Sequence, residues 1–306
     1  MGISQYIKEI GRGPRGSKPL TREQAADLFG QLLDGNVTDL EIGAFCLAMR
    51  IKGETPEEMC GFLDAAHSRM ALFPASDRPV IVLPSYNGAR KLPVLTPLLA
   101  LLLAREGLPV LLHGMRTEAR RTLASDVLLA LGVPALTAPE KIATGSAAHI
   151  ETGYLHAALA RLLKVREVVG LRNAGHSIVK LMNPCAGPAV VVTSYTHPEY
   201  YDMLQATFGA LHMTALLSRG LEGEVATDPR RTPRYDAFVA GVHQLLQEQQ
   251  PGTAADVPGL PTEIDIDTTA RYTQDVLDGR LPVPPALAQQ VEHILHLAAQ
   301  TPPHAP

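Results

Sequence analysis

Three segments near the N-terminus combine a helix-capping pattern with helically spaced apolar positions. Each begins at a threonine that is followed three residues later by Gln or Glu, and these threonines are Thr21, Thr38 and Thr55. In this arrangement the two side chains and the first backbone amides of a helix cap one another. Apolar residues then recur at intervals of three and four, which is the spacing of one helix face. We therefore predict a small helical domain over residues 1–72.

Beyond residue 73 the pattern changes to short apolar runs that alternate with helix-like segments. We predict strands at 79–83, 109–113, 189–193 and 212–217, and helices at 96–105, 122–131 and 198–208. Alternating strands and helices of this kind form a largely parallel sheet that is covered on both faces. The sequence thus predicts an α/β domain over residues 73–306, with a loop at 249–261, where Gly, Pro and Ala are concentrated.

Composition narrows the class of protein. Hydrophobic residues make up 46% of the chain and charged residues 19%, as in a globular protein. No apolar run reaches the length of about 18 residues that spans a bilayer, and the N-terminus does not have the form of a secretory signal. The three cysteines, Cys46, Cys60 and Cys185, are scattered and odd in number. This usage fits a reducing compartment, so we expect a cytoplasmic protein.

The charges are unevenly distributed along the chain. A net charge of −4 by itself argues against a nucleic-acid partner. Even so, basic residues gather in three stretches with few acids, and such asymmetry can create a local positive face on an acidic protein. Ordinary solvated side chains are the alternative interpretation. The three groups are Lys8, Arg12, Arg15, Lys18 and Arg22; Arg90, Lys91, Arg116, Arg120 and Arg121; and Arg161, Lys164, Arg166, Arg172 and Lys180.

Two short motifs are better explained as surface features than as sites. Residues 11–16 fit G-x-G-x-x-G, but a dinucleotide site requires a strand before the glycines and a helix directly after them. The preceding segment is helix-like and the next helix begins only near Thr21, so we predict a basic loop. His293 and His296 share a helix face but lack a third metal ligand, which favours a surface helix.

Several stretches, taken in order, carry a resemblance to a known superfamily. They are residues 20–66 with their capping boxes, 113–116 (HGMR), 125–132 (SDVLLALG), 169–172 (VGLR) and 182–184 (MNP). The chain resembles the anthranilate phosphoribosyltransferase and pyrimidine nucleoside phosphorylase superfamily, or glycosyl transferase family 3. The resemblance covers nearly the whole chain. It implies that residues near 161–184 join the helical domain.

The departures from the superfamily pattern fall on residues that carry its chemistry. The transferases bind a sugar diphosphate with a loop of the form G-T-G-G-D, whose amides approach the phosphates closely. Residues 84–88 replace it with Pro-Ser-Tyr-Asn-Gly, in which Pro84 has no N–H group. The Lys and Asn of the motif K-H-G-N-R become Leu112 and Met115. We therefore do not expect phosphoribosyl transfer.

The superfamily's acidic metal motif is altered as well. Its G-L-D-E corresponds to residues 220–225, which keep Glu222 and Glu224 but no adjacent acidic pair. Magnesium requires oxygen ligands in near-ideal geometry. We expect no metal, no cofactor and no catalytic residue. The alternative is an anthranilate phosphoribosyltransferase or another pentosyl transferase acting on a phosphorylated sugar, for which Mg²⁺ would be required.

A closer resemblance is to the YbiB family, a branch of the same superfamily. It is carried by residues 8–13 (KEIGRG), 84–91 (PSYNGARK), 197–200 (HPEY) and 222–225 (EGEV). The resemblance implies a homodimer that binds single-stranded DNA and RNA with little sequence preference and has no known transferase activity. We expect the dimer to form through the helical domain, because the apolar faces of its short helices are large for so small a module.

The expected nucleic-acid-binding residues follow from the basic groups and the resemblance. Tyr86 could stack on a base, and a buried structural role is the alternative that the sequence leaves open. A rival interpretation is that the basic groups recognise a small phosphorylated ligand in an altered pocket. The residues assigned to phosphate neutralisation are Lys8, Arg12, Arg15, Arg90, Lys91, Arg172 and Lys180.

Overall fold

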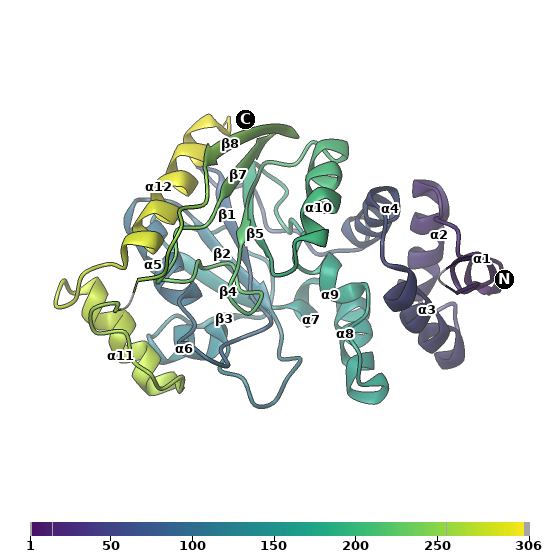
Figure 1. The fold of residues 1–306 in the computed structure, drawn as a ribbon, viewed down its shortest axis with the longest axis horizontal. Helices are drawn as coiled ribbons and strands as arrows, with labels where there is room; N and C mark the ends of the chain where they lie inside the picture. The colour runs from purple at the N-terminus through teal and green to yellow at the C-terminus, as the bar shows by residue number, and fades with distance from the viewer. Residues whose placement is uncertain (1, 14, 255, 303–306) are drawn as a thin grey trace.

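The computed structural model describes residues 2–13, 15–254 and 256–302. The four N-terminal helices form a bundle at one end of the molecule (Figure 1). In the helices that follow Thr21, Thr38 and Thr55, the threonine hydroxyl and the Gln or Glu side chain three residues later form the predicted capping box. The helices are α1 (Ser4–Ile10), α2 (Arg22–Leu33), α3 (Asp39–Lys52) and α4 (Pro56–His67).

The helical bundle has a small core of its own. The rings of Phe29, Phe45 and Phe62 meet with centroids 5.0–6.2 Å apart. Aromatic pairs at such separations contribute beyond the area they bury. Glu58 is fully buried, accepts a 2.9 Å hydrogen bond from the Leu20 amide and forms an ion pair with Lys52. These contacts fix the segment before α2 against α4.

Strands of the second half form one sheet of eight strands within the described residues. Its order is β3-β4-β2-β1-β5-β6-β7-β8, and all neighbouring pairs from β3 to β6 are parallel. The last two strands run antiparallel. The strands are β1 (Val80–Pro84), β2 (Val110–Gly114), β3 (Ala135–Leu136), β4 (Ala147–Glu151), β5 (Ala189–Tyr195), β6 (Ala215–Arg219), β7 (Tyr235–Val239) and β8 (Val242–Gln247).

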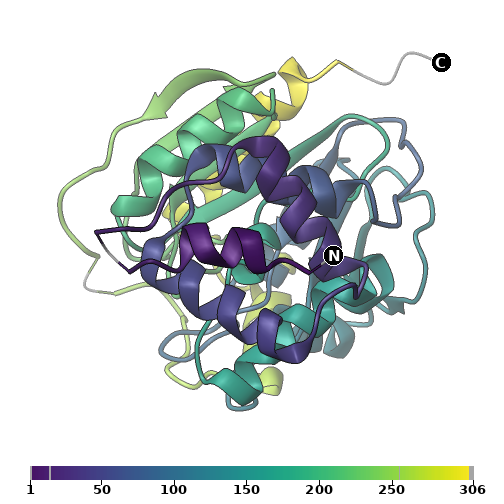
Figure 2. The same cartoon turned by 90° about the vertical axis from the view of Figure 1, so that its right-hand side faces the viewer.

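Helices cover both faces of this sheet. One face packs against α5, α11 and α12, and the other lies under α10 and continues into the core of the helical bundle. Figures 1 and 2 show α8 beside α1–α4 and away from the sheet. These helices are α5 (Thr96–Arg105), α6 (Ala124–Ala130), α7 (Thr152–Leu155), α8 (Ala157–Val169), α9 (Gly175–Ile178), α10 (Glu199–Ala210), α11 (Ile266–Leu277) and α12 (Pro285–Gln300).

The predicted elements correspond closely to β1, β2, β5, β6, α5, α6 and α10. The sequence interpretation missed β3, β4, β7 and β8, and the described part of 249–261 contains neither helix nor strand. Residue 255 of that segment lies outside the described residues. No helix in the described part of the chain has both the length and the apolar character to cross a bilayer.

Candidate functional site

The parallel strands bring their carboxyl ends to one edge of the sheet, and the loops that leave this edge face the helical bundle. The loop after β1 covers residues 85–95, the loop after β2 covers 115–123, and the turn after β6 begins at residue 220. Ligands of open α/β sheets bind at such an edge. We therefore built the candidate site from these three loops and from α8 and α9, which pack next to them.

The loop after β1 holds a carboxylate of the same chain. Glu224, only 5% exposed, accepts hydrogen bonds from the amides of Asn87 (3.0 Å) and Gly88 (2.8 Å). It also accepts from the hydroxyls of Ser85 (2.5 Å) and Thr96 (3.0 Å). We call these two amides and two hydroxyls the anion site. Its donors are engaged by a side chain of the same protein.

The neighbouring carboxylate of Glu222 binds the same loop farther along. Its Oε2 accepts from the amides of Arg90 (2.8 Å) and Lys91 (3.2 Å), and its Oε1 lies 3.5 Å from Arg90 Nε. Glu222 has a φ of 56°, a left-handed conformation that is costly for a residue with a side chain. Two carboxylates thus hold the 220–224 segment against the loop after β1.

These carboxylates do not fit a magnesium site. Both oxygens of Glu224 and one oxygen of Glu222 accept hydrogen bonds from the loop or from Thr96. Within the described residues, no three His, Cys, Asp or Glu side chains are grouped so that they could hold a metal ion. Mg²⁺ needs oxygen ligands that are free to face it. The residues that replace the superfamily's metal motif serve instead as hydrogen-bond acceptors for a loop.

A partly buried carboxylate organises the arginines of this edge. Glu118, in the loop after β2, forms ion pairs with Arg166 (2.8 Å), Arg121 (3.0 Å) and Arg172 (3.4 Å). Burial alone would raise the pKa of Glu118, but the hydrogen bonds from Arg166 and Arg121 outweigh it and lower the pKa to about 2. Glu118 is therefore ionised at neutral pH and ties α8 to the loop after β2.

Members of the second and third basic groups of the sequence meet around this network. Arg121 also approaches the Gly88 carbonyl oxygen, and Arg172 donates to the Asn87 side chain, so the two loops and the segment after α8 are linked. Basic side chains outnumber acidic ones here, and the Arg90 side chain is 62% exposed. We call this set the edge cluster; it comprises Arg90, Lys91, Arg116, Arg120, Arg121, Arg166 and Arg172, opposed by Glu118, Asp126 and Glu222.

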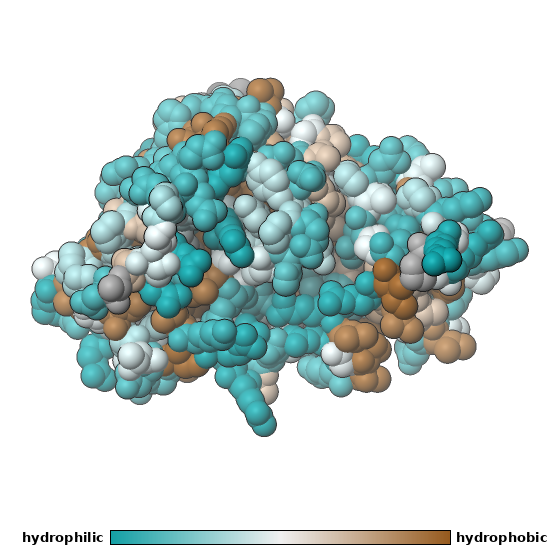
Figure 3. Space-filling model, viewed as in Figure 1, coloured by the Kyte–Doolittle hydropathy of each residue, from teal (hydrophilic) through white to brown (hydrophobic). Residues whose placement is uncertain are grey.

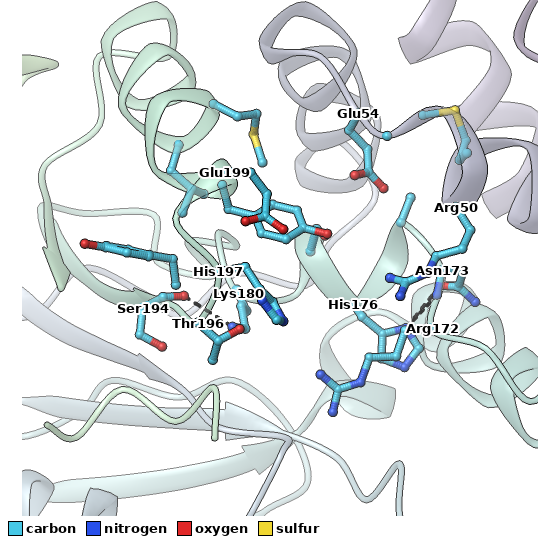
Figure 4. A pocket seen from close by; sticks show the side chains of 18 of the residues that line it. Arg50, Glu54, Arg172, Asn173, His176, Lys180, Ser194, Thr196, His197 and Glu199 are labelled. Carbon is cyan, nitrogen blue, oxygen red and sulfur yellow. Dashed lines mark hydrogen bonds between the residues drawn. The ribbon is translucent and has the colours of Figure 1, made fainter. Parts of the chain in front are cut away.

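A pocket of about 510 Å³ opens beside the edge cluster, between the helical bundle and the α/β part (Figure 4). Its charged and aromatic lining comes from α3, from α9 and the segment before it, and from the end of β5 and the start of α10. Basic side chains again outnumber acidic ones. The lining includes Arg50, Glu54, Arg172, His176, Lys180, Tyr195, His197, Glu199 and Tyr200.

Among the described residues, two polar groups of this pocket are buried without a hydrogen-bond partner. His176 Nε2 and Ser194 Oγ make no hydrogen bond among the described residues. Burial and the nearby charge of Arg172 lower the pKa of His176 to about 3, so the imidazole is neutral. The same two causes lower the pKa of Lys180 to about 8, and its Nζ donates to the Ser194 carbonyl oxygen. Buried polar groups usually have partners, so this lining suits a polar ligand.

Tyr86 is buried, with 2% of its surface exposed. Its hydroxyl donates a 2.8 Å hydrogen bond to the His176 carbonyl oxygen, and the Arg172 guanidinium lies 5.9 Å from its ring centroid. Tyr86 also contributes to the lining of the pocket, with little of its surface exposed. This burial favours the structural role of the two considered for Tyr86, and stacking on a base stays a prediction.

The structure does not gather the predicted phosphate-binding residues on one surface of a single chain. Lys8 on α1 and Arg12 just after it lie at the N-terminal end of the helical bundle, where Arg12 pairs with Glu9 at 2.8 Å. Arg15 is exposed in the loop that follows, where Pro14 lies outside the described residues. The other members lie at the carboxyl edge of the sheet: Arg90 and Lys91 on the loop after β1, and Arg172 and Lys180 in the pocket lining.

Sequence reasoning did not anticipate three features of this site. The ion pairs of Glu118, the pocket position of Arg50 and the internal use of Glu224 depend on contacts between distant segments. One signal was available, because residues 197–200 belong to a stretch that resembles the YbiB family and contribute His197 and Tyr200 to the pocket.

The two short motifs have surface roles in the described structure. Residues 11–16 follow a helix, α1, instead of a strand, so the context of a dinucleotide site is missing. His293 and His296 lie on α12, as predicted. Their ring nitrogens contact the side chains of Gln247 and Gln300.

Comparisons with known proteins agree with this architecture. Residues 4–70 match the helical bundle domain of a glycosyl transferase family. The chain is 37% identical to the protein YbiB of Escherichia coli (strain K12), over 95% of this chain and 92% of that protein. It is 28% identical to the anthranilate phosphoribosyltransferase of Persephonella marina (strain DSM 14350 / EX-H1), over 91% of this chain and 83% of that enzyme.

Solved structures show the same fold at lower identity. Anthranilate phosphoribosyltransferase from Thermus thermophilus superimposes with a TM-score of 0.72 at 22% identity, covering 96% of this chain and 87% of that one. The Saccharomyces cerevisiae enzyme in complex with PRPP and Mg gives a TM-score of 0.70 at 13% identity, covering 97% of this chain and 88% of that one.

Proposed function

Since the chain belongs to the YbiB family, within the glycosyl transferase family 3 and anthranilate phosphoribosyltransferase superfamily, we propose that it binds single-stranded nucleic acid and transfers no phosphoribosyl group. The observation that carries this proposal is the edge cluster. Its basic side chains come from two loops, from α8 and from the segment between α8 and α9, and they form a cationic edge on a chain whose net charge is −4.

The chemistry of the edge cluster suits a phosphate backbone. Exposed Arg90 and Lys91 can neutralise phosphates directly, while Arg166 and Arg172 are held in place by Glu118. Phosphate contacts of this kind position a strand without reading its sequence. The pocket beside the cluster offers the rings of His197 and Tyr200, and bases stack on aromatic side chains with little sequence preference. We assign base stacking to these residues in place of Tyr86.

The loop after β1 supports the absence of transfer. A sugar diphosphate is held in the superfamily by loop amides, and here the amides of Asn87 and Gly88 bind Glu224. A diphosphate at this position would have to displace a buried carboxylate and would meet its negative charge. The described residues also offer no fitting magnesium site, and it is this ion that would neutralise a diphosphate leaving group.

We also propose that two chains associate through the helical bundle. Three exposed apolar side chains on α3 share one helix face: Leu40 (84% exposed), Leu47 (47%) and Ile51 (58%). Val168 (89%) and Leu171 (43%) continue the exposed apolar surface at the end of α8, and Figure 3 shows apolar atoms gathered over these helices. Exposed apolar patches commonly mark interfaces, and a second copy of the chain is the expected occupant.

A second candidate function is recognition of a small phosphorylated ligand in the pocket. It is favoured by His176 Nε2 and Ser194 Oγ, which have no partner among the described residues, and by the adjacent Lys180. The two candidates differ in what they predict for binding. A pocket ligand would be a mononucleotide or sugar phosphate bound by each chain, whereas strand binding strengthens with oligonucleotide length.

Fluorescence anisotropy with labelled oligonucleotides of increasing length distinguishes the candidates. We expect affinity for single-stranded DNA to rise with length and to vary little between sequences. Excess mononucleotide should compete weakly. If a mononucleotide binds as tightly as a long oligonucleotide, the pocket-ligand function replaces the proposed one.

A further inference from the structure

Two tyrosines and two arginines outside the edge cluster lie together at the carboxyl edge of the sheet. Tyr195 and Arg219 are the last residues of β5 and β6 and are partners in the parallel ladder. Arg219 and Arg234 directly flank the last pair of the antiparallel β6–β7 ladder, so they lie across from each other. Tyr201 comes from the first turn of α10. We call these four residues the tyrosine–arginine row.

The row belongs to the face of the sheet that α10 covers. Side chains alternate between the two faces along a strand. Leu217, two residues before Arg219, lies in the core beneath α10. Phe238, four residues after Arg234, lies in the same core, and the two tyrosines of the row pack against it. The three strands therefore direct these side chains to one side of the sheet.

The side chains of the row lie close to one another. The ring centroids of Tyr195 and Tyr201 are 5.4 Å apart, and the Arg234 guanidinium lies 5.6 Å from the Tyr201 centroid. Burial and the charge of Asp236 raise the pKa of Tyr195, whereas the charges of Arg219 and Arg234 act in the opposite direction. Both guanidinium groups are therefore near the Tyr195 hydroxyl. Both rings are only partly buried.

The two arginines of the row differ in how they are held. Asp236, 1% exposed, accepts from Nε and Nη2 of Arg234 at 2.8 and 2.9 Å, a bidentate pair that fixes the guanidinium. Arg234 also reaches the exposed Glu248 at 3.3 Å, and surface pairs of this kind contribute little. Arg219 is exposed and forms no ion pair within the part of the chain that the structure describes. Its charge is consequently open to an outside anion.

The row is continuous with the pocket, and the pocket is continuous with the edge cluster. Tyr195 lines the pocket together with Thr196 and His197, which follow it in the chain (Figure 4). Arg172 belongs both to the pocket lining and to the edge cluster. A strand that passes from the edge cluster through the pocket therefore reaches the row at Tyr195.

We propose that the tyrosine–arginine row is a second contact site for single-stranded nucleic acid, in which one base stacks on the Tyr195 ring and Arg219 neutralises a neighbouring phosphate. The inference rests on the proposed function and extends the path of the strand beyond the pocket. A tyrosine ring accepts any base, and an arginine accepts any phosphate. The site thus adds affinity without adding sequence preference.

The test compares two labelled strands of about 16 nucleotides, a length at the upper end of common single-strand sites. One is oligothymidylate and the other has the same backbone without bases. Tyr195→Ala should weaken binding of oligothymidylate at least about fivefold, the lower end of the effect of losing one base–aromatic stack. It should bind the abasic strand like the parent. Tyr195→Phe is the matched control, since it keeps the ring and should bind both strands like the parent.

Arg219→Ala tests the phosphate contact. It should weaken both strands and make the slope of log affinity against log salt shallower by about 0.7, the contribution of one phosphate on a single strand. Arg271→Ala removes an exposed arginine on α11, which covers the other face of the sheet, and should leave affinity and slope unchanged.

Thermal unfolding checks that each variant is folded. If Tyr195→Ala is unfolded, Tyr195→Leu takes its place, because leucine fills part of the volume without offering a ring. Folded Tyr195 and Arg219 variants that bind oligothymidylate like the parent overturn the inference. An equal loss of affinity for the abasic strand in the Tyr195 variant overturns the stacking role, because the ring would then act only on the structure.

These outcomes are distinguishable from failure of the proposed function. If the parent binds oligothymidylate and the row variants bind equally well, only the second contact site is lost, and binding by the edge cluster stands. If the parent binds neither strand at low salt, the proposed function fails and this inference fails with it.

Discussion

The carboxylate of Glu224 accepts a 2.8 Å hydrogen bond from the backbone amide of Gly88, a residue 136 positions earlier in the chain. Gly88 closes the loop that replaces the glycine-rich loop of the transferases, and Glu224 comes from the stretch that replaces their acidic metal motif. Two departures that look independent in the sequence are therefore partners in the structure. The amides of Asn87 and Gly88 in this loop both donate to Glu224.

The first prediction concerns enzymatic activity. Purified protein incubated with anthranilate, phosphoribosyl diphosphate and Mg²⁺ should form no phosphoribosyl anthranilate, because the loop amides are occupied and the carboxylates that replace the metal motif are engaged by the loop. Product is measured by the loss of anthranilate fluorescence, with an active anthranilate phosphoribosyltransferase as the positive control. Turnover of about 1 per second or more, typical of enzymes, would show that the chain is a transferase.

The second prediction concerns assembly. The parent protein should have twice the mass of one chain by light scattering at micromolar concentration. Leu47→Glu should shift it to the mass of one chain, because a charge on the exposed apolar face of α3 would be desolvated in the dimer. Leu129→Glu is the control, since Leu129 is 60% exposed on α6, outside the helical bundle. A parent protein that is monomeric throughout excludes this dimer.

The third prediction concerns stability and pH. Burial lowers the pKa of His113, in β2, to about 4, whereas an unfolded histidine has a pKa near 6.5. The unfolded chain thus binds the proton more tightly than the folded chain. The contribution of neutral His113 to the free energy of unfolding is therefore fully present above pH 6.5 and is lost as pH falls toward 4. The residue should contribute a slope of about 1.4 kcal/mol per pH unit within this window.

Urea unfolding of the parent and of His113→Leu between about pH 6.5 and 5, below the pKa of an unfolded histidine, measures this contribution. The free energy of unfolding should decrease less steeply in the variant, because leucine takes up no proton. Other buried histidines, such as His176, act in the same direction and leave a residual slope in both proteins. Parallel pH profiles would mean that His113 is protonated equally in the folded and unfolded chains.

The fourth prediction concerns the thiols. Cys46, Cys60 and Cys185 are free and buried, and burial raises the pKa of Cys46 to about 11 and that of Cys185 to about 12. Since the thiolate is the reactive form, Ellman's reagent should modify the native protein slowly and all three thiols rapidly in denaturant. Rapid modification of the native protein would indicate that a cysteine is far more accessible than the structure has it.

Local patterns predicted much of the fold. The capping boxes at Thr21, Thr38 and Thr55 act within one turn, so the sequence contains all of their partners. The buried strands β1, β2, β5 and β6 were recognisable as continuous apolar runs. By contrast, β8 is largely exposed and mixes apolar with polar residues, and it is defined by pairing with β7. Neither the strand preference of its residues nor a continuous apolar run identifies such a strand in the sequence.

The candidate site was predictable only in outline. The uneven distribution of basic residues indicated which segments could contribute to the site. The order of the strands in the sheet determines which of these segments lie next to one another. Arg172, in the segment after α8, donates to Asn87 in the loop after β1, while Arg12 stays at the far end of the bundle. The burial of Tyr86 likewise follows from the packing of α9 and not from the residues next to it.

Salt dependence of single-strand binding tests the central claim most directly. The logarithm of affinity should fall with the logarithm of salt concentration with a slope of about −3 or steeper, because each neutralised phosphate contributes roughly −0.7. Replacing Arg90, Lys91 and Arg120 by alanine should flatten the slope and weaken all sequences alike. Stability should change little, since these three side chains are exposed.

A matched control variant distinguishes the effect of the edge cluster from that of losing positive charge anywhere on the protein. Arg78→Ala with Lys141→Ala removes exposed positive charge at the other edge of the sheet, before β1 and β4, and should leave the slope unchanged. Replacing Lys8, Arg12 and Arg15 by alanine tests whether the N-terminal end of the bundle contacts the same nucleic-acid strand in the dimer.

The deciding measurement is the anisotropy titration of the parent and the edge variant at a series of salt concentrations. The account predicts a steep slope for the parent and a shallower one for the edge variant; it is contradicted if the parent shows no binding at low salt, or if the folded edge variant binds with the same affinity and slope.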